Sequence, residues 1–144
     1  MSHHYEDYLY DLPLFLGCSR KELRKFASLA ERVVAPPGRI FVTEGTRTKD
    51  FYLLRSGTAS VTRRGVEIAR LRPGDHFGEL AILDPGPRNA TVTMTSAGEV
   101  ICLAQREFWT LLRDLPALRH VLLASLARRV HELERAPTAL DATF

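Results

Sequence analysis

The sequence predicts a mainly β domain, an all-β sandwich or barrel with helices at both of its ends. Three observations support this fold class. Residues 40–104 contain short apolar runs separated by glycines, as expected for several short strands joined by turns. On either side of this region, apolar residues recur at helical spacing. The length of 144 residues fits one domain with its own hydrophobic core.

The helices on the N-terminal side are predicted at residues 12–32, after a tail at residues 1–11. Ser19 followed three residues later by Glu22 is a capping-box signature, which marks the start of a helix. The Pro-Pro-Gly sequence at residues 36–38 cannot continue a helix, so the helical region ends before it.

The β-rich region is predicted at residues 36–104. Side chains alternate in character along several of its runs, and β-branched residues are frequent, as a half-buried strand requires. The glycines between the runs supply turn conformations that other residues adopt only at a cost. The predicted strands are Arg39–Thr43, Phe51–Arg55, Thr58–Arg63, Glu67–Leu71, Thr91–Thr95 and Val100–Ala104.

The helices on the C-terminal side are predicted at residues 105–135, with a break at Pro116 and a loose tail at residues 136–144. The longer helix carries an apolar stripe close to heptad spacing. This stripe packs either against the same domain or against its copy in a homodimer, since the pattern serves both purposes. The stripe consists of Leu118 or Arg119, Leu122, Leu126, Val130 and Leu133.

The segment most informative about function is PGDHFGELAILDPGPRNATV, residues 73–92. A short helix is predicted after Gly78, where the missing side chain lets a ligand approach the backbone. Arg88 offers a fork of donors that suits phosphate, and Glu79 offers an acceptor for sugar hydroxyls. Together they match a ribose-phosphate. The alternative interpretation is that Glu79 and Arg88 form an ordinary structural ion pair or contact solvent.

Charge narrows the class of ligand. One arginine with the N–H groups of a helix N-terminus balances about one negative charge, which is what a cyclic phosphodiester carries. A triphosphate would call for a glycine-rich lysine loop, and the sequence contains no GxxxxGK[ST] motif.

The segment FGELAILDPGPRNATV resembles the phosphate-binding cassette of the cyclic-nucleotide-binding domain family, which includes regulatory subunits of the cAMP-dependent protein kinase and the bacterial catabolite activator protein. The segments LPLF…SRKEL, PPGRIFVTEG, DFYLLRSGTASV, LRPGDHFGE and REFWTLLRDLP also resemble family segments, in family order. The resemblance covers about residues 12–133. It implies a cyclic-nucleotide-binding domain at residues 12–135. In this domain a β jelly-roll, or double-stranded β-helix, at residues 36–104 contains the cassette at residues 77–91 and is flanked by N-terminal helices at 12–32 and C-terminal helices at 105–135.

In that family the cassette glutamate binds the ribose 2′-hydroxyl, the arginine binds the cyclic phosphate, and backbone groups of the cassette assist. The implied ligand is cAMP, with cGMP as the alternative. The choice depends on Asn89, because cAMP-favouring members often have alanine or serine at that position and cGMP-favouring members often have threonine. The resemblance implies a ligand site made of Gly78, Glu79, Leu80, Ala81, Arg88, Asn89 and Ala90.

The resemblance also implies a regulatory domain without catalytic machinery, which relays ligand occupancy to its C-terminal helices. Residues 77–83 are expected to move when the ligand binds, against a hinge helix that carries Phe108, Leu111 and Leu112. The C-terminal helix of the family often covers the base, and here that helix corresponds to a part of residues 122–133. The effector protein is left open.

Other classes of function find little support in the sequence. The net charge is only +3 and basic residues are interleaved with acidic ones, whereas a DNA-binding domain concentrates them on one face. A helix-turn-helix does not fit in residues 136–144. A metalloenzyme on a jelly-roll requires clustered histidines, and only His76, interpreted as a turn or surface residue, lies in the β-rich region. Cys18 and Cys102 indicate neither a disulfide nor a metal site. We therefore expect no enzyme, no metal site and no nucleic-acid binding.

No apolar run approaches the length of a membrane span, and the N-terminal sequence MSHHYEDYLYDLPLF lacks the features of an export signal. We therefore expect a cytoplasmic protein that does not bind membranes. Two alternatives stay open. In the first, the chain is the sensor part of a larger transcription regulator, channel or enzyme. In the second, it is a domain that has lost its ligand and serves as a dimerisation module.

Overall fold

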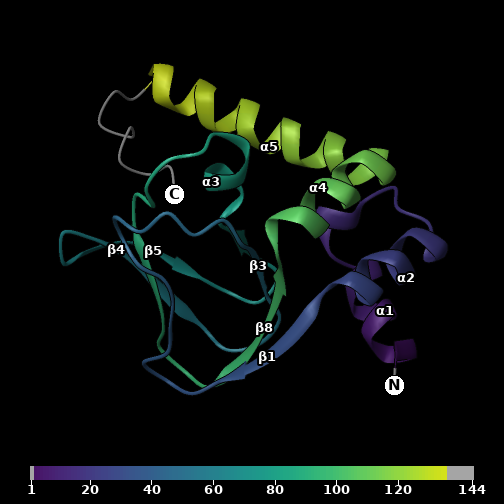
Figure 1. The fold of residues 1–144 in the computed structure, drawn as a ribbon, viewed down its shortest axis with the longest axis horizontal. Helices are drawn as coiled ribbons and strands as arrows, with labels where there is room; N and C mark the ends of the chain where they lie inside the picture. The colour runs from purple at the N-terminus through teal and green to yellow at the C-terminus, as the bar shows by residue number, and fades with distance from the viewer. Residues whose placement is uncertain (1, 136–144) are drawn as a thin grey trace.

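The computed structural model describes residues 2–135, so the predicted tail at residues 136–144 lies outside the described residues. Figure 1 shows a β sandwich with several helices gathered beside it and one long helix, α5, running along the top above the short helix α3. The helices are α1 (Ser2–Tyr10), the 3-10 helix η1 (Pro13–Phe15), α2 (Arg20–Leu29), α3 (Glu79–Leu83), α4 (Gln105–Asp114) and α5 (Pro116–Arg135).

The sandwich consists of two four-stranded antiparallel sheets. One sheet has the order β1-β8-β3-β6, with strands β1 (Glu31–Ala35), β8 (Gly98–Leu103), β3 (Phe51–Leu54) and β6 (His76–Phe77). The other sheet has the order β2-β7-β4-β5, with strands β2 (Ile40–Val42), β7 (Thr91–Met94), β4 (Ala59–Arg63) and β5 (Val66–Leu71). The predicted fold class, a mainly β sandwich flanked by helices, is confirmed.

Two hydrophobic cores lie on opposite faces of the sheet that contains β3. Side chains alternate between the two faces of a strand, and in β3 all four are buried because both faces are covered. Phe51 and Leu53 belong to the core under the helices, whereas Tyr52 and Leu54 belong to the core between the two sheets. The core under the helices and the core between the sheets therefore share the strand β3.

All six predicted strands are present with ends shifted by no more than two residues, and two further strands were missed. The prediction of helix up to residue 32 was wrong at its end, because β1 begins at Glu31. Only one of the five β1 residues is buried, so this strand lacks apolar alternation, and it is stabilised by pairing along its whole length with β8. The other missed strand, β6, has only two residues.

The N-terminus also differs from the prediction of a tail at residues 1–11. Residues 2–10 form α1, in which Tyr5 and Leu9 are buried in the core under the helices. These two residues lie one helical turn apart and face the same way. The guanidinium of Arg32 lies 4.6 Å from the centroid of the Tyr5 ring and covers it from the sheet side. A single turn of apolar side chains is too short to give a periodic signal, so the helix was not visible in the sequence.

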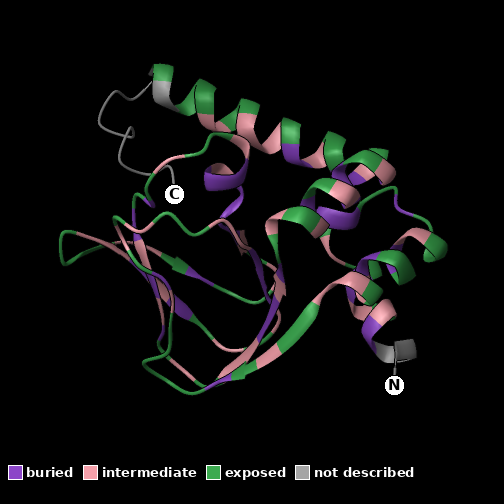
Figure 2. Ribbon diagram, viewed as in Figure 1, coloured by how far each residue is buried: buried purple, intermediate pink, exposed green. Residues whose placement is uncertain are grey.

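The predicted apolar stripe of α5 changes its surroundings along the helix. Leu118 and Leu122 are buried in the core under the helices, Leu126 is half-buried, and Val130 is 52% exposed. The upper side of α5 is correspondingly exposed in Figure 2. The first half of the stripe thus packs against the domain, and the side chain of Leu133 lies outside the described residues.

Candidate functional site

The second residue of the cassette is a glycine that the backbone requires. Gly78 has a φ of 95°, in the left-handed region, and it directly precedes α3. A Cβ atom at this position would lie 2.5 Å from the carbonyl oxygen of Asp50 and 3.1 Å from Nη1 of Arg88. Any other residue would therefore be strained and would push the chain away from its neighbours.

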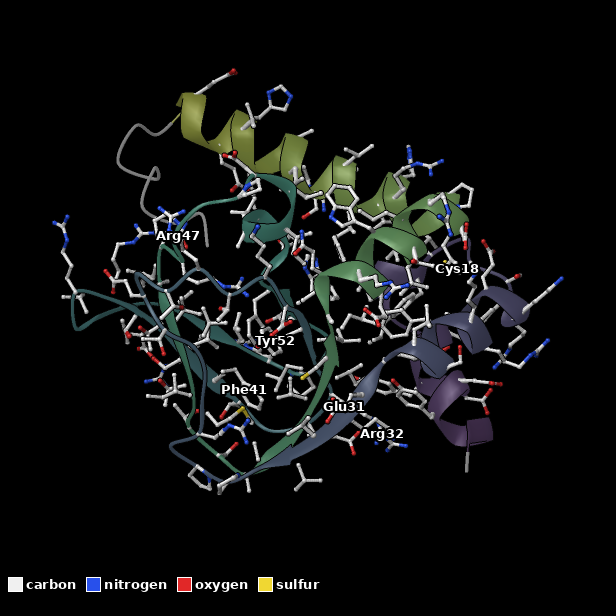
Figure 3. All side chains as sticks on the ribbon, in the orientation of Figure 1. Cys18, Glu31, Arg32, Phe41, Arg47 and Tyr52 are labelled. Atoms are coloured by element: carbon white, nitrogen blue, oxygen red, sulfur yellow. The ribbon has the colours of Figure 1, made fainter. Side chains whose placement is uncertain are left out.

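An aromatic stack with a ring from β3 supports the start of the cassette. The ring of Tyr52 lies 4.9 Å from the ring of Phe77, with the two planes nearly parallel. Tyr52 and Phe41 lie close together inside the sandwich (Figure 3), and the Tyr52 hydroxyl donates a hydrogen bond to the backbone oxygen of Phe41. These contacts hold Phe77 and the following glycine against β3.

The guanidinium of Arg88 is buried and is fixed by three oxygen atoms. Nη1 donates to the carbonyl of Gly78 at 3.0 Å, Nη2 donates to the carbonyl of Asp50 at 2.9 Å, and Nε donates to the hydroxyl of Thr48 at 3.1 Å. Three of the five N–H groups of the side chain are used in this way. Burial lowers the pKa of Arg88 from its ordinary value, but arginine remains charged at neutral pH.

A cavity of about 380 Å³ lies beside this arginine, between the cassette and the strands β2 and β7. Its size is within the usual range of small-molecule sites. The apolar part of its wall is formed by Val42, Phe77 and Val92, and the bend at residues 84–87 lies at its edge. The structure brings six of the seven predicted site residues into the wall, namely Gly78, Leu80, Ala81, Arg88, Asn89 and Ala90.

Glu79 is the predicted site residue that does not line the cavity. Its side chain is 1% exposed, and its Oε1 accepts a hydrogen bond at 3.2 Å from Nη1 of Arg129, on α5. Its Oε2 lies 3.4 Å from Nδ1 of His76. Burial alone would raise the pKa of Glu79, but contacts with His76 and Arg129 outweigh it and lower the pKa, so the carboxylate is ionised.

Two interpretations made from the sequence are corrected by these contacts. Glu79 and Arg88 do not hydrogen-bond to each other, because each is bound by different groups. His76 is not a surface turn residue, since it belongs to β6 and its side chain is only 15% exposed. Sequence reasoning missed Arg129 altogether. It lies 50 positions from Glu79, and nothing in the local pattern of α5 distinguishes it from the neighbouring arginine.

The geometry of the cassette agrees with a comparison to known proteins. A family model described as "Cyclic nucleotide-binding domain" matches residues 32–114. The chain belongs to the cyclic-nucleotide-binding domain family. The match includes the whole cassette and most of both sheets.

Members of this family with similar sequences include kinase subunits and bacterial regulators. The cAMP-dependent protein kinase regulatory subunit of Eremothecium gossypii is 38% identical over 109 residues, which are 75% of this chain and 24% of that protein. The cyclic AMP receptor protein of Thermus thermophilus is 34% identical over 127 residues, 85% of this chain and 59% of that protein. The chain thus spans less than two thirds of the length of either relative.

The fold is shared with solved members of the family. The crystal structure of the Thermus thermophilus catabolite activator protein superposes with a TM-score of 0.80 at 33% identity, over 89% of this chain and 62% of that chain. This likeness confirms the predicted jelly-roll with flanking helices.

The described part of the chain, residues 2–135, shows no sign of a membrane-spanning helix or a metal site. No helix within residues 2–135 has both the length and the apolar character needed to cross a membrane. In the same range, no three His, Cys, Asp or Glu side chains are grouped as metal ligands. Cys18 and Cys102 are free thiols.

Proposed function

We propose that this domain is a non-catalytic sensor that binds cAMP in the cavity beside Arg88 and relays its occupancy to α5. One observation carries the proposal: a buried arginine, fixed by three oxygen atoms, stands in the wall of a cavity of about 380 Å³. Two of its five N–H groups make none of these three bonds. A buried cation with spare donors in a cavity wall suits one anionic group, such as the phosphate of a cyclic nucleotide.

The rest of the wall suits the remainder of such a ligand. Val42, Phe77 and Val92 offer apolar surface to a base. The cavity carries one buried cation, which balances the single charge of a cyclic phosphodiester. We propose adenine as the base because the names of similar proteins refer to cAMP. cGMP stays the alternative, because Asn89 lines the same cavity.

The relay is proposed on the contact between Glu79 and Arg129. The family assigns the cassette glutamate to the ribose hydroxyl, yet this carboxylate is held here by α5. A ligand hydroxyl would compete with Arg129 for the same oxygen atoms, so binding would change the hold of the cassette on α5. The packing supports a coupled movement, because Ile82 of α3 shares a core with Phe108 and Leu111 of α4.

Isothermal titration with cAMP and cGMP tests the proposal. We expect wild type to bind, and Arg88→Ala to lose about 2–5 kcal/mol of binding free energy, thirtyfold or more in Kd. Arg106→Ala is the matched control, because Arg106 is an exposed arginine on α4. Equal affinity in Arg88→Ala and wild type would refute the site. No binding of either nucleotide, in protein shown by mass spectrometry to be ligand-free, would favour a domain that has lost its ligand.

A homodimer through α5 is proposed on the exposed side of this helix. Leu123 is 61% exposed and Val130 is 52% exposed, with the exposed Ala127 between them. These residues follow helical spacing and form an apolar stripe, as a paired helix requires. Leu123→Glu should shift the mass measured by light scattering from dimer to monomer, whereas Leu16→Glu, at an exposed leucine outside α5, should not. A monomeric wild type would contradict the proposal.

A cytoplasmic location stays a prediction.

A further inference from the structure

A cluster of three ionisable side chains, one buried and two partly buried, lies on the side of the cassette that faces α5. It consists of His76 from β6, Glu79 from α3 and Arg129 from α5. Arg129 donates a hydrogen bond to Oε1 of Glu79 at 3.2 Å. On the other oxygen the contact is incomplete. Oε2 of Glu79 and Nδ1 of His76 lie 3.4 Å apart, both are buried, and neither makes a well-formed hydrogen bond within the described residues.

This incomplete contact depends on the protonation of His76. A neutral imidazole carries one proton, which is on either of its two nitrogens, whereas a protonated imidazole donates from both. Protonation therefore places a proton on Nδ1 and a positive charge next to the ionised carboxylate. Both changes strengthen the hold on Glu79. Histidine is the side chain that ordinarily changes its charge between about pH 5 and pH 8.

The ring of His76 is held in place for this contact and remains reachable by water. It lies 5.7 Å from the ring of Phe51, with the two planes close to parallel. It also lines a second cavity of about 430 Å³, between the start of the cassette and α5. Protons thus have a path to the ring. The charged groups around it are Glu79 on α3, Arg128 and Arg129 on α5, Arg70 on β5 and Asp75 in the turn before β6.

We propose that His76 is a positioning residue for Glu79 and makes ligand binding proton-linked. Protonated His76, together with Arg129, holds the carboxylate on the α5 side of the cassette, away from the ligand cavity. Loss of the proton removes the positive charge beside Oε2 and leaves Nδ1 a donor in only one of the two neutral tautomers. The hold on the carboxylate is then weaker, and the carboxylate is released toward the ligand hydroxyl. This inference rests on the proposed function, since it assigns regulation to the same site. Its sign is fixed: affinity falls as the pH falls, and the ligand releases a proton when it binds.

The test is the Kd for cAMP measured by isothermal titration between about pH 5.5 and pH 8.5, in buffers of different ionisation enthalpy. The affinity of wild type for cAMP should fall toward low pH by at most about tenfold per pH unit, which is the limit for one linked proton. His76→Gln should bind with nearly constant affinity across this range. His120→Gln should keep the wild-type profile, because His120 is an exposed histidine on α5.

Three results would overturn the inference. A flat wild-type profile would do so, as would a wild-type slope in His76→Gln. If His76→Gln fails to fold, as judged by circular dichroism, the inference is tested on the wild-type protein alone. The number of protons that wild type releases per bound cAMP is obtained from the buffer dependence. The inference requires a number above zero, and a value of zero overturns it. Binding with a flat profile refutes only this inference, whereas no binding at any pH refutes the proposed function as well.

Discussion

Removing Arg129 is expected to destabilise the folded protein, because it leaves a buried carboxylate with one partner fewer. Glu79 is 1% exposed, and its pKa is lowered only because neighbouring charges outweigh its burial. Breaking a fully buried pair costs about 3–5 kcal/mol. The Arg129 side chain is 26% exposed and His76 stays 3.4 Å from the carboxylate, so water and the imidazole replace part of the lost interaction. We therefore expect Arg129→Ala to lose about 1–3 kcal/mol of unfolding free energy at pH 7.

Urea denaturation followed by the fluorescence of Trp109, the single tryptophan, measures this loss. In a Glu79→Gln background the same Arg129→Ala change should cost clearly less, because the charge that Arg129 neutralises is gone. Arg128→Ala, at the exposed neighbouring position, should change the unfolding free energy by no more than about 0.5 kcal/mol. Equal losses with and without the Glu79 carboxylate would refute the reasoning.

The pH dependence has a fixed sign. The folded-state pKa of Glu79 lies below its ordinary value, so the stability it contributes is present above about pH 4.3 and is lost as the pH falls through the folded pKa. In Arg129→Ala the folded pKa moves upward, since burial raises it and one opposing charge is absent. The stability difference between wild type and this variant should therefore be largest near neutral pH and shrink in acid. A difference that stays constant down to about pH 3.5 would contradict this.

Three further predictions concern other parts of the structure. Gly78→Ala should lose at least about 1–2 kcal/mol of unfolding free energy because of its left-handed backbone alone, and the contact of the new Cβ with Asp50 should add to this loss. In Gly86→Ala the new Cβ meets no atom within 4 Å, so the unfolding free energy in the same urea titration should be nearly unchanged. Leu9→Ala should cost about 2–5 kcal/mol by thermal unfolding, because Leu9 is fully buried; a cost below about 0.5 kcal/mol would show that α1 is detached. In hydrogen exchange, cAMP should change the protection of α5 around Arg129, and unchanged protection throughout residues 105–135 would contradict the relay.

Much of the site was predictable because its determinants are local in sequence. Gly78 and Arg88 lie ten residues apart in one segment, and one hydrogen bond joins the Arg88 side chain to the Gly78 carbonyl. Their contacts with Thr48 and Asp50 come from another part of the chain and were not predicted. The residue types of Gly78 and Arg88 predict a tight turn and, in the proposed function, a phosphate ligand. The six cavity-lining residues of the prediction all come from this stretch, so the family pattern was sufficient to place them.

The orientation of Glu79 was not predictable, because it depends on a residue from a distant helix. Arg129 comes to Glu79 only through the path of α5 over the cassette, and that path is set by Leu118 and Leu122 in the core. The missed elements have a similar cause. β1 is mostly exposed and is stabilised by pairing with β8. α1 is stabilised by the core under the helices and by the Arg32 guanidinium that lies over its Tyr5 ring. Long-range contacts of this kind leave little trace in local sequence.

The shortness of β6 has a consequence for how the cassette can open. β6 is an edge strand, and it is attached to β3 by only two paired positions, Tyr52 with Phe77 and Leu53 with His76. Short edge elements detach locally at little free energy, while a strand covered on both faces opens only when the whole domain unfolds. The N-terminal end of the cassette is therefore able to separate from β3 while β3 stays paired with β8. The amides of Phe77 and β3 would then exchange with solvent at very different rates, although the two lie side by side in one sheet.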